Sequence, residues 1–142
     1  MPQHTILIDS NIIIYAINRT SPKHLIAQKF LQDNIANLAV AQQNILESLM
    51  VLTHRKFEYP METKAALKAV SAISDKSRVL APSKVTGYIF MDLLKKYSVS
   101  GDKIFDIYLV STALSSSVNL IATDNINDFA HISEVKTINP FV

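Results

Sequence analysis

The sequence has 142 residues, which is the length of one domain that can bury a sizeable core. Apolar residues make up 49% and charged residues 18%, a composition that indicates a globular protein and excludes an intrinsically disordered chain. The net charge of +2 indicates no class of partner by itself, while the lack of cysteine excludes disulfides and thiolate metal sites.

Short apolar runs alternate with helical patterns along the first half of the chain. Pro22 is expected to begin a helix, and Pro60 prevents another helix from continuing far. The predicted elements are a strand at 5–8, an apolar continuation at 12–17, a helix from 22 to about 35, a strand at 38–41, and helices at 42–55 and 61–74.

The second half of the chain repeats this alternation. The predicted elements are a strand at 78–82, a helix at 83–97, a break at Gly101, a helix at 103–117, a strand at 119–123, a turn at 124–129 and a strand at 134–138. No hairpin signal occurs, so the strands are expected to form a parallel sheet covered by helices on both faces. We predict an α/β fold and one domain over residues 1–142.

The ends and apolar runs of the sequence give an expectation about the cellular compartment. No apolar run approaches the roughly 20 residues that span a bilayer. The opening residues MPQHTILID lack the basic start of a signal peptide. We therefore expect a cytoplasmic protein with no membrane contact.

Two carboxylates fall on apolar helical stretches, where an isolated charge is costly unless it is protonated or paired. Glu47 lies among Ile, Leu and Met residues and has no Lys or Arg three or four positions away. Asp106 lies on or beside a buried stripe, with Lys103 three residues before it. The alternatives are a position at the rim of the apolar face for Glu47, and an ion pair with Lys103 for Asp106.

Further acids lie where predicted strands end. Asp9 follows the first strand, and Asp124 and Asp128 follow the strand at 119–123. Ligands of open α/β sheets collect outside the carboxyl ends of the strands, so these acids are expected to reach one crevice if the two strands are neighbours. Asp124 or Asp128 could instead be a helix cap in a turn.

Clustered oxygen ligands without cysteine favour Mg²⁺ or Mn²⁺ as the bound cation. Such a cation can hold a phosphodiester and activate a water molecule. Setting aside the five acids of the predicted cluster leaves seven acids against 14 Lys and Arg residues. That balance suits a polyanionic substrate, although composition alone favours an ordinary solvated surface over this reading.

Three segments together resemble the PIN domain family, and in particular its small single-domain members that act as toxins of bacterial VapBC-type toxin–antitoxin pairs. They are ILIDSNIIIYAI at the start, NILESLMVL in the middle, and KIFDIYLVSTALSSSVNLIATDNINDF followed by INPF at the end. The resemblance implies a three-layer α/β/α fold and a Mg²⁺- or Mn²⁺-dependent endoribonuclease for single-stranded RNA. It also implies a homodimer and an antitoxin protein partner.

The resemblance assigns roles to individual residues. Asp9, Glu47 and Asp106 match the first three acids of the family, while Asn11 and Thr123 match the residues that support the first acid. The fourth acid departs from the common pattern, because Asn125 stands where many relatives have it. Asp128 matches an acid that other relatives place just before the phenylalanine, and Asp124 lies close enough to contribute.

Two other functions are compatible with parts of the sequence. Asp9 could act as the nucleophile of a phosphate-transfer protein, but Asn11 stands where such phosphatases have a second Asp, and the early acidic pair of receiver domains is missing. The chain could instead be a non-catalytic module of the same fold that binds RNA or a protein. The retained acids argue against that reading, because a buried negative cluster does not help a binding module.

Overall fold

The computed structural model describes residues 4–142, so the first three residues of the opening segment lie outside the described part. Helices and strands alternate as the sequence predicts. They are β1 (Ile6–Ile8), α1 (Ser10–Ile17), α2 (His24–Asp33), η1 (Ile35–Asn37), β2 (Leu38–Ala41), α3 (Gln42–Thr53), α4 (Thr63–Ser74), β3 (Arg78–Leu80), α5 (Lys84–Tyr97), α6 (Lys103–Ser115), β4 (Leu120–Ala122), η2 (Ile126–Asp128) and β5 (Lys136–Ile138).

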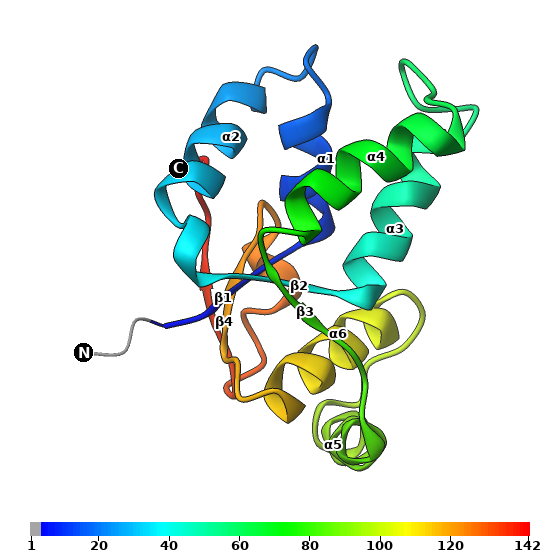
Figure 1. Cartoon of the computed structure of the whole chain (residues 1–142). Helices are drawn as coiled ribbons and strands as arrows, with labels where there is room; N and C mark the ends of the chain where they lie inside the picture. The colour runs from blue at the N-terminus through cyan, green and yellow to red at the C-terminus, as the bar shows by residue number, and fades with distance from the viewer. Residues whose placement is uncertain (1–3) are drawn as a thin grey trace.

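The five strands form one parallel sheet in the order β3-β2-β1-β4-β5 (Figure 1). The first strand is central, with β2 on one side and β4 on the other. The chain builds the sheet outward from β1 in one direction and then returns to build it in the other. The carboxyl ends of β1 and β4 therefore flank the position where open α/β sheets bind ligands. The predicted α/β class and the parallel sheet are confirmed.

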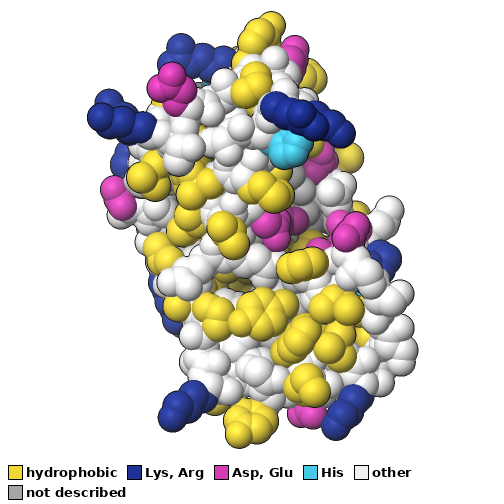
Figure 2. Space-filling view, turned by 90° about the vertical axis from the view of Figure 1, so that its right-hand side faces the viewer, with side chains coloured by type: hydrophobic (Ala, Val, Ile, Leu, Met, Phe, Trp, Pro, Cys, Tyr) yellow, Lys and Arg dark blue, Asp and Glu magenta, His cyan; other side chains and the backbone are white. Residues whose placement is uncertain are grey.

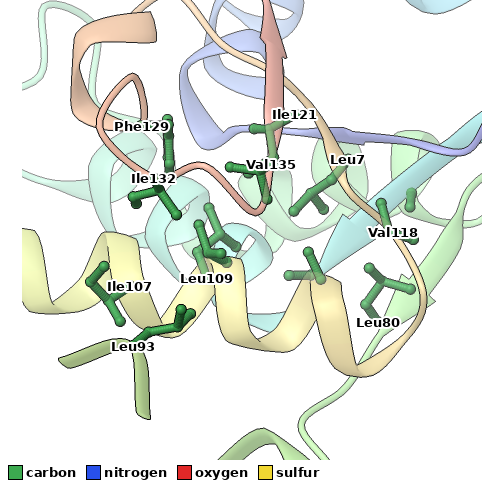
Figure 3. Close-up of a cluster of buried hydrophobic side chains, with 14 residues drawn as sticks. Leu7, Leu80, Leu93, Ile107, Leu109, Val118, Ile121, Phe129, Ile132 and Val135 are labelled. Carbon is green, nitrogen blue, oxygen red and sulfur yellow. The ribbon is translucent and has the colours of Figure 1, made fainter. Parts of the chain in front are cut away.

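Both faces of the sheet are buried, because residues that alternate along each strand feed two separate cores. Ile6 and Ile8 pack with α1, α2, α3 and α4 on one face. Leu7 points to the opposite face, where α5 and α6 cover it (Figures 1 and 3). Phe129, which follows η2, is fully buried in this second core. The result is the expected three-layer α/β/α arrangement.

The boundaries of several elements differ from the predicted ones by a few residues. Pro22 lies in the turn before α2, and the turn is closed by the backbone N–H of His24, which donates to the carbonyl of Ser21. Asp102 stands at the N-cap of α6, but its side chain makes no capping hydrogen bond. Helix ends fray and are poorly marked in sequence, so shifts of this size are ordinary.

The helices are short. The longest in the described part, α5, has 14 residues. No helix within residues 4–142 combines the length and apolar character needed to cross a membrane.

Candidate active site

Asp9 lies directly after the central strand and before the first residue of α1. Its Oδ1 accepts a hydrogen bond of 2.8 Å from the backbone N–H of Ser10, and its Oδ2 accepts one of 2.8 Å from the hydroxyl of Thr123. Thr123 follows β4, which pairs with β1 in parallel. The sheet therefore brings together two residues that are 114 positions apart in the sequence.

The hydroxyl of Thr123 is forced to donate to Asp9. Its oxygen already accepts hydrogen bonds from the side-chain amide of Asn11 at 3.2 Å and from the backbone N–H of Asn125 at 3.0 Å. A hydroxyl has two lone pairs and one proton, so the remaining proton points to the carboxylate. The predicted supporting residues Asn11, Thr123 and Asn125 thus lie together beside Asp9, although Asn125 contributes its backbone N–H and not its side chain.

Glu47 on α3 is held in place by residues that the sequence did not single out. The hydroxyl of Ser10 donates to its Oε2 at 3.0 Å, and the side-chain amide of Gln43 donates to its Oε1 at 3.1 Å. The amide of fully buried Asn44 donates to the Ser10 hydroxyl at 3.2 Å and lies 3.5 Å from Oδ1 of Asp9. These side chains connect Asp9 and Glu47 through a continuous set of hydrogen bonds. Ordinary Ser, Gln and Asn residues at helix starts give no sequence signal for such a role.

Asp106, in the first turn of α6, is a carboxylate with a strongly raised pKa. Burial raises its pKa from 3.8 to about 7, and the negative charges of Asp128 and Asp9 add to this effect. Lys103 opposes the rise in pKa and Glu47 adds to it. No ion pair between Asp106 and Lys103 is present among the described residues, so the simple pairing explanation does not hold.

The pKa of Asp9 is raised as well. Burial is the main cause, the hydrogen bonds from Thr123 and Ser10 oppose it, and the charges of Glu47 and Asp128 add to it. The charges of Glu47 and Asp128 act on the pKa of both Asp9 and Asp106, and Asp9 acts on the pKa of Asp106. The four acids therefore share one electrostatic environment. We call these four residues the acidic cluster.

Asp124 lies in a different set of contacts. Its Oδ2 accepts a hydrogen bond of 2.9 Å from the hydroxyl of Tyr15 and forms an ion pair with Lys23. Burial pushes the pKa of Asp124 up, but the hydrogen bonds from Lys23 and Tyr15 outweigh it and leave the pKa below its usual value. The sequence left open which of Asp124 and Asp128 is the fourth acid. The charge of Asp128 adds to the raised pKa of Asp9 and Asp106, whereas the carboxylate of Asp124 contacts Lys23 and Tyr15.

The donor chemistry of the acidic cluster fits a hard divalent cation. All of its side-chain donors are carboxylate oxygens, and a cation would relieve the repulsion that adds to the effect of burial on the pKa of Asp9 and Asp106. No group of three or more Asp, Glu or His side chains within residues 4–142 is already arranged to hold a metal ion. The carboxylates would therefore have to move toward a cation when it binds.

The face that carries acidic side chains at its centre also exposes many apolar side chains (Figure 2). An apolar groove of about 470 Å³ lies between α3 and α6, lined among others by Gln43, Leu46, Phe105 and Tyr108. Leu46 is 69% exposed and Phe105 63% exposed. The groove adjoins the cluster, because Gln43 lines the groove and its amide donates to Glu47. Sequence patterns gave no indication of this groove.

A family model for the PIN domain matches residues 6–135 of the chain. A search of the curated proteins finds no match.

Solved structures with the same fold cover nearly the whole chain. A crystal structure of VapBC2 from Rickettsia felis, bound to a DNA fragment from their promoter, is 18% identical, with a TM-score of 0.70 over 95% of this chain and 98% of that one. VapC20 from Mycobacterium tuberculosis, described as a sarcin-ricin loop cleaving toxin, is 15% identical, with a TM-score of 0.69 over 92% and 98%. DNA-bound VapBC from Salmonella typhimurium is 16% identical, with a TM-score of 0.70 over 97% and 99%. At these identities the likeness shows the fold alone.

Proposed function

The chain belongs to the PIN domain family, and on that premise we propose that it is a metal-dependent endoribonuclease that cleaves single-stranded RNA. The observation that carries this proposal is the acidic cluster. Its members come from the end of β1, from α3, from α6 and from η2, at the switch point of the sheet. Burial raises the pKa of Asp9 and of Asp106, and the charges of the other acids in the cluster add to the rise. Perturbed pKa values of this kind concentrate at functional sites.

We propose Asp9, Glu47, Asp106 and Asp128 as the residues that hold Mg²⁺ or Mn²⁺. When bound, such a cation supplies positive charge to a phosphodiester and lowers the pKa of an attacking water molecule. Oxygen-only donors favour these two cations over softer metals. Asp124 was also predicted as a ligand, and its contacts with Lys23 and Tyr15 support a different role.

The other residues of the site orient the carboxylates. Thr123 directs its proton to Asp9, which favours the ionised form of that acid against the effect of burial. Ser10 and Gln43 each donate to one oxygen of Glu47, so this carboxylate is held in one orientation. Orienting groups of this kind strengthen metal binding by their immediate partners.

The charge distribution supports RNA as the substrate. With Asp124 and the acidic cluster set aside, seven acids remain against 14 Lys and Arg residues. A basic exterior attracts a polyanion, and phosphate contacts dominate such binding. Single-stranded RNA also offers unstacked bases to exposed side chains near the site.

We further propose that the protein is the toxin of a toxin–antitoxin pair, that an antitoxin protein binds it, and that it forms a homodimer. The similar folds of the VapBC2 and VapBC complexes support the antitoxin. The apolar groove beside the acidic cluster supports a protein interface, because its exposed Leu46 and Phe105 offer apolar and aromatic side chains, and aromatic residues are enriched at interfaces. Light scattering of the isolated chain tests the dimer, and a short neighbouring gene for a DNA-binding protein would identify the antitoxin.

The nuclease activity is tested with the purified chain and a labelled single-stranded RNA. We expect cleavage with Mg²⁺ or Mn²⁺ and none with a chelator. Asp9→Asn should abolish cleavage, whereas Asp33→Asn should not, because Asp33 pairs with Lys29 on the exposed face of α2. A wild-type protein that binds neither cation in calorimetry and cleaves no RNA would instead support the non-catalytic binding module.

A further inference from the structure

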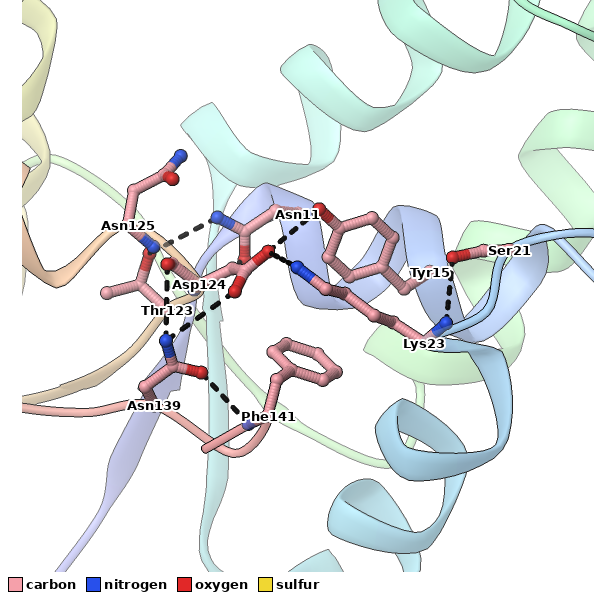
Figure 4. Close-up of polar contacts among 9 residues, drawn as sticks. All are labelled: Asn11, Tyr15, Ser21, Lys23, Thr123, Asp124, Asn125, Asn139 and Phe141. Carbon is pink, nitrogen blue, oxygen red and sulfur yellow. Dashed lines mark hydrogen bonds and ion pairs between the residues drawn. The ribbon is translucent and has the colours of Figure 1, made fainter.

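Asp124, in the loop after β4, contacts three other segments of the chain (Figure 4). Its carboxylate contacts Tyr15 on α1 and Lys23 in the loop before α2. The side-chain amide of Asn139, near the C-terminus, donates to the Asp124 carbonyl at 3.2 Å. The ammonium of Lys23 also lies 5.4 Å from the ring centre of Phe141. The loop after β4 is therefore fixed from both sides.

A chain of hydrogen bonds leads from Asp124 to Asp9. The backbone N–H of Asp124 donates to the side-chain oxygen of Asn11 at 3.2 Å, which orients the Asn11 amide toward Thr123. The next backbone N–H, that of Asn125, donates to the same Thr123 hydroxyl. The two hydrogen bonds that the Thr123 hydroxyl accepts thus depend on where residues 124 and 125 lie. Because these bonds use both lone pairs of the hydroxyl, its proton points to Asp9.

The contacts of Asp124 do more than an ordinary surface ion pair. An exposed pair between a lysine and a carboxylate contributes little to stability. The Asp124 side chain is only 14% exposed and accepts from two donors, and one of these, Tyr15, packs edge to face against Phe141. Its partners are all outside the acidic cluster. A carboxylate whose oxygen already serves Lys23 and Tyr15 is poorly placed to take up a cation.

We propose that Asp124 is a positioning residue, which acts through Lys23 and Tyr15 to hold the Asn11–Thr123 pair against Asp9, and that it is not a metal ligand. The part that concerns catalysis rests on the proposed nuclease function. The part that concerns geometry does not, because it is defined by hydrogen bonds of this chain alone. The experiment below reads the two parts separately.

The test compares Asp124→Asn, Lys23→Met and their combination with the control Lys29→Met, which breaks an exposed ion pair on α2. We expect each of the two single variants to lower the kcat for RNA cleavage about 10-fold, as small misplacements near a reacting group do. The KM for RNA and the Kd for Mn²⁺ from calorimetry should stay within about twofold, and the double variant should be no worse than the single ones. Lys23→Arg should restore most of the activity, and Lys29→Met should retain it.

A second measurement does not require activity. The side-chain amide signal of Asn11 in the nitrogen–proton NMR spectrum should shift in Asp124→Asn and Lys23→Met, and should stay in place in Lys29→Met. If the wild-type protein cleaves no RNA but this shift occurs, the nuclease proposal fails and the positioning proposal stands. Unchanged kcat and an unchanged amide signal overturn the positioning proposal. Mn²⁺ binding that is at least 10-fold weaker in Asp124→Asn but unchanged in Lys23→Met overturns it as well, because Asp124 would then be a ligand.

Discussion

Replacing Asp106 by Asn should stabilise the metal-free protein at neutral and basic pH. The folded protein holds Asp106 protonated up to a pKa of about 7, whereas the unfolded chain releases this proton near the ordinary value of 3.8. The folded state therefore binds more protons than the unfolded state between these two values. Its stability falls as the pH rises through this interval, and the loss is complete above pH 7. An Asn side chain at this position removes the loss.

The size of the effect follows from the shift in pKa. One unit corresponds to about 1.4 kcal/mol, so a rise from 3.8 to about 7 would give an upper bound of about 4 kcal/mol. Asp106 is only partly buried, and solvent screening reduces the value, so we expect about 1–2 kcal/mol. For a chain of this length that is a rise in Tm of about 3–6 °C.

The assay is thermal unfolding followed by circular dichroism in a chelating buffer, at a series of pH values from 4 to 8. The advantage of Asp106→Asn should be close to zero at pH 4, grow up to pH 7 and then remain constant. Asp92→Asn, on an exposed position of α5, removes the same charge away from the acidic cluster and should show no such trend. An advantage that is absent at pH 8, or equally large at pH 4, would refute the reasoning. Added Mn²⁺ should stabilise the wild-type protein more than the variant, because a cation favours the ionised carboxylate.

Three further predictions concern the support of the acidic cluster and the core beneath it. Thr123→Val leaves the Asn11 amide and the Asn125 N–H without their acceptor, so we expect a loss of about 1–3 kcal/mol in urea unfolding, and an unchanged midpoint would contradict these two hydrogen bonds. Ser10→Ala removes the donor to Glu47 and should lower RNA cleavage about 10- to 100-fold, whereas Ser74→Ala, at the end of α4, should retain full activity because the Ser74 hydroxyl donates to the Ser71 carbonyl of its own helix. Phe129→Ala, in the core under α6, should cost about 3–5 kcal/mol in the same urea unfolding, whereas Ile126→Ala at a partly exposed position should cost much less.

The fold class can be predicted from the sequence because it depends on patterns within short segments of the chain. Alternation of apolar strands with helical patterns indicates a parallel sheet, and the all-parallel order around β1 confirms it. The same patterns do not give the order of strands, because the sequence of a three-residue strand such as β1 or β4 does not indicate which strand pairs with it. The extent of the domain over residues 1–142 stays a prediction.

The candidate site also has a part that the sequence indicates and a part that only the fold determines. Glu47 and Asp106 stand out in sequence because a charge on an apolar helical stretch needs a reason, and Asp9 because it ends a strand. The choice between Asp124 and Asp128 could not be made from sequence. It depends on the turn of η2 and on an ion pair with Lys23, 101 positions away. The roles of the acids in catalysis stay a proposal.

Ser10, Gln43 and Asn44 were not predicted at all. Their function depends on hydrogen bonds across 34 to 62 residues of sequence, and such residues are common at helix starts for unrelated reasons. A polar side chain that the fold buries completely, as Asn44 is, would have been the only hint, and burial cannot be read from one residue type.

The acidic cluster draws its members from both outer layers of the molecule. Glu47 is on α3, which covers one face of the sheet, and Asp106 is on α6, which covers the other. The amide of Gln43 connects them, since it donates to Glu47 and also to the carbonyl of Phe105 at 3.0 Å. Without a cation the two helices carry charges that repel across this edge. A bound divalent ion would fasten them together, so amide hydrogen exchange should slow in the first turns of α3 and α6 at the same time.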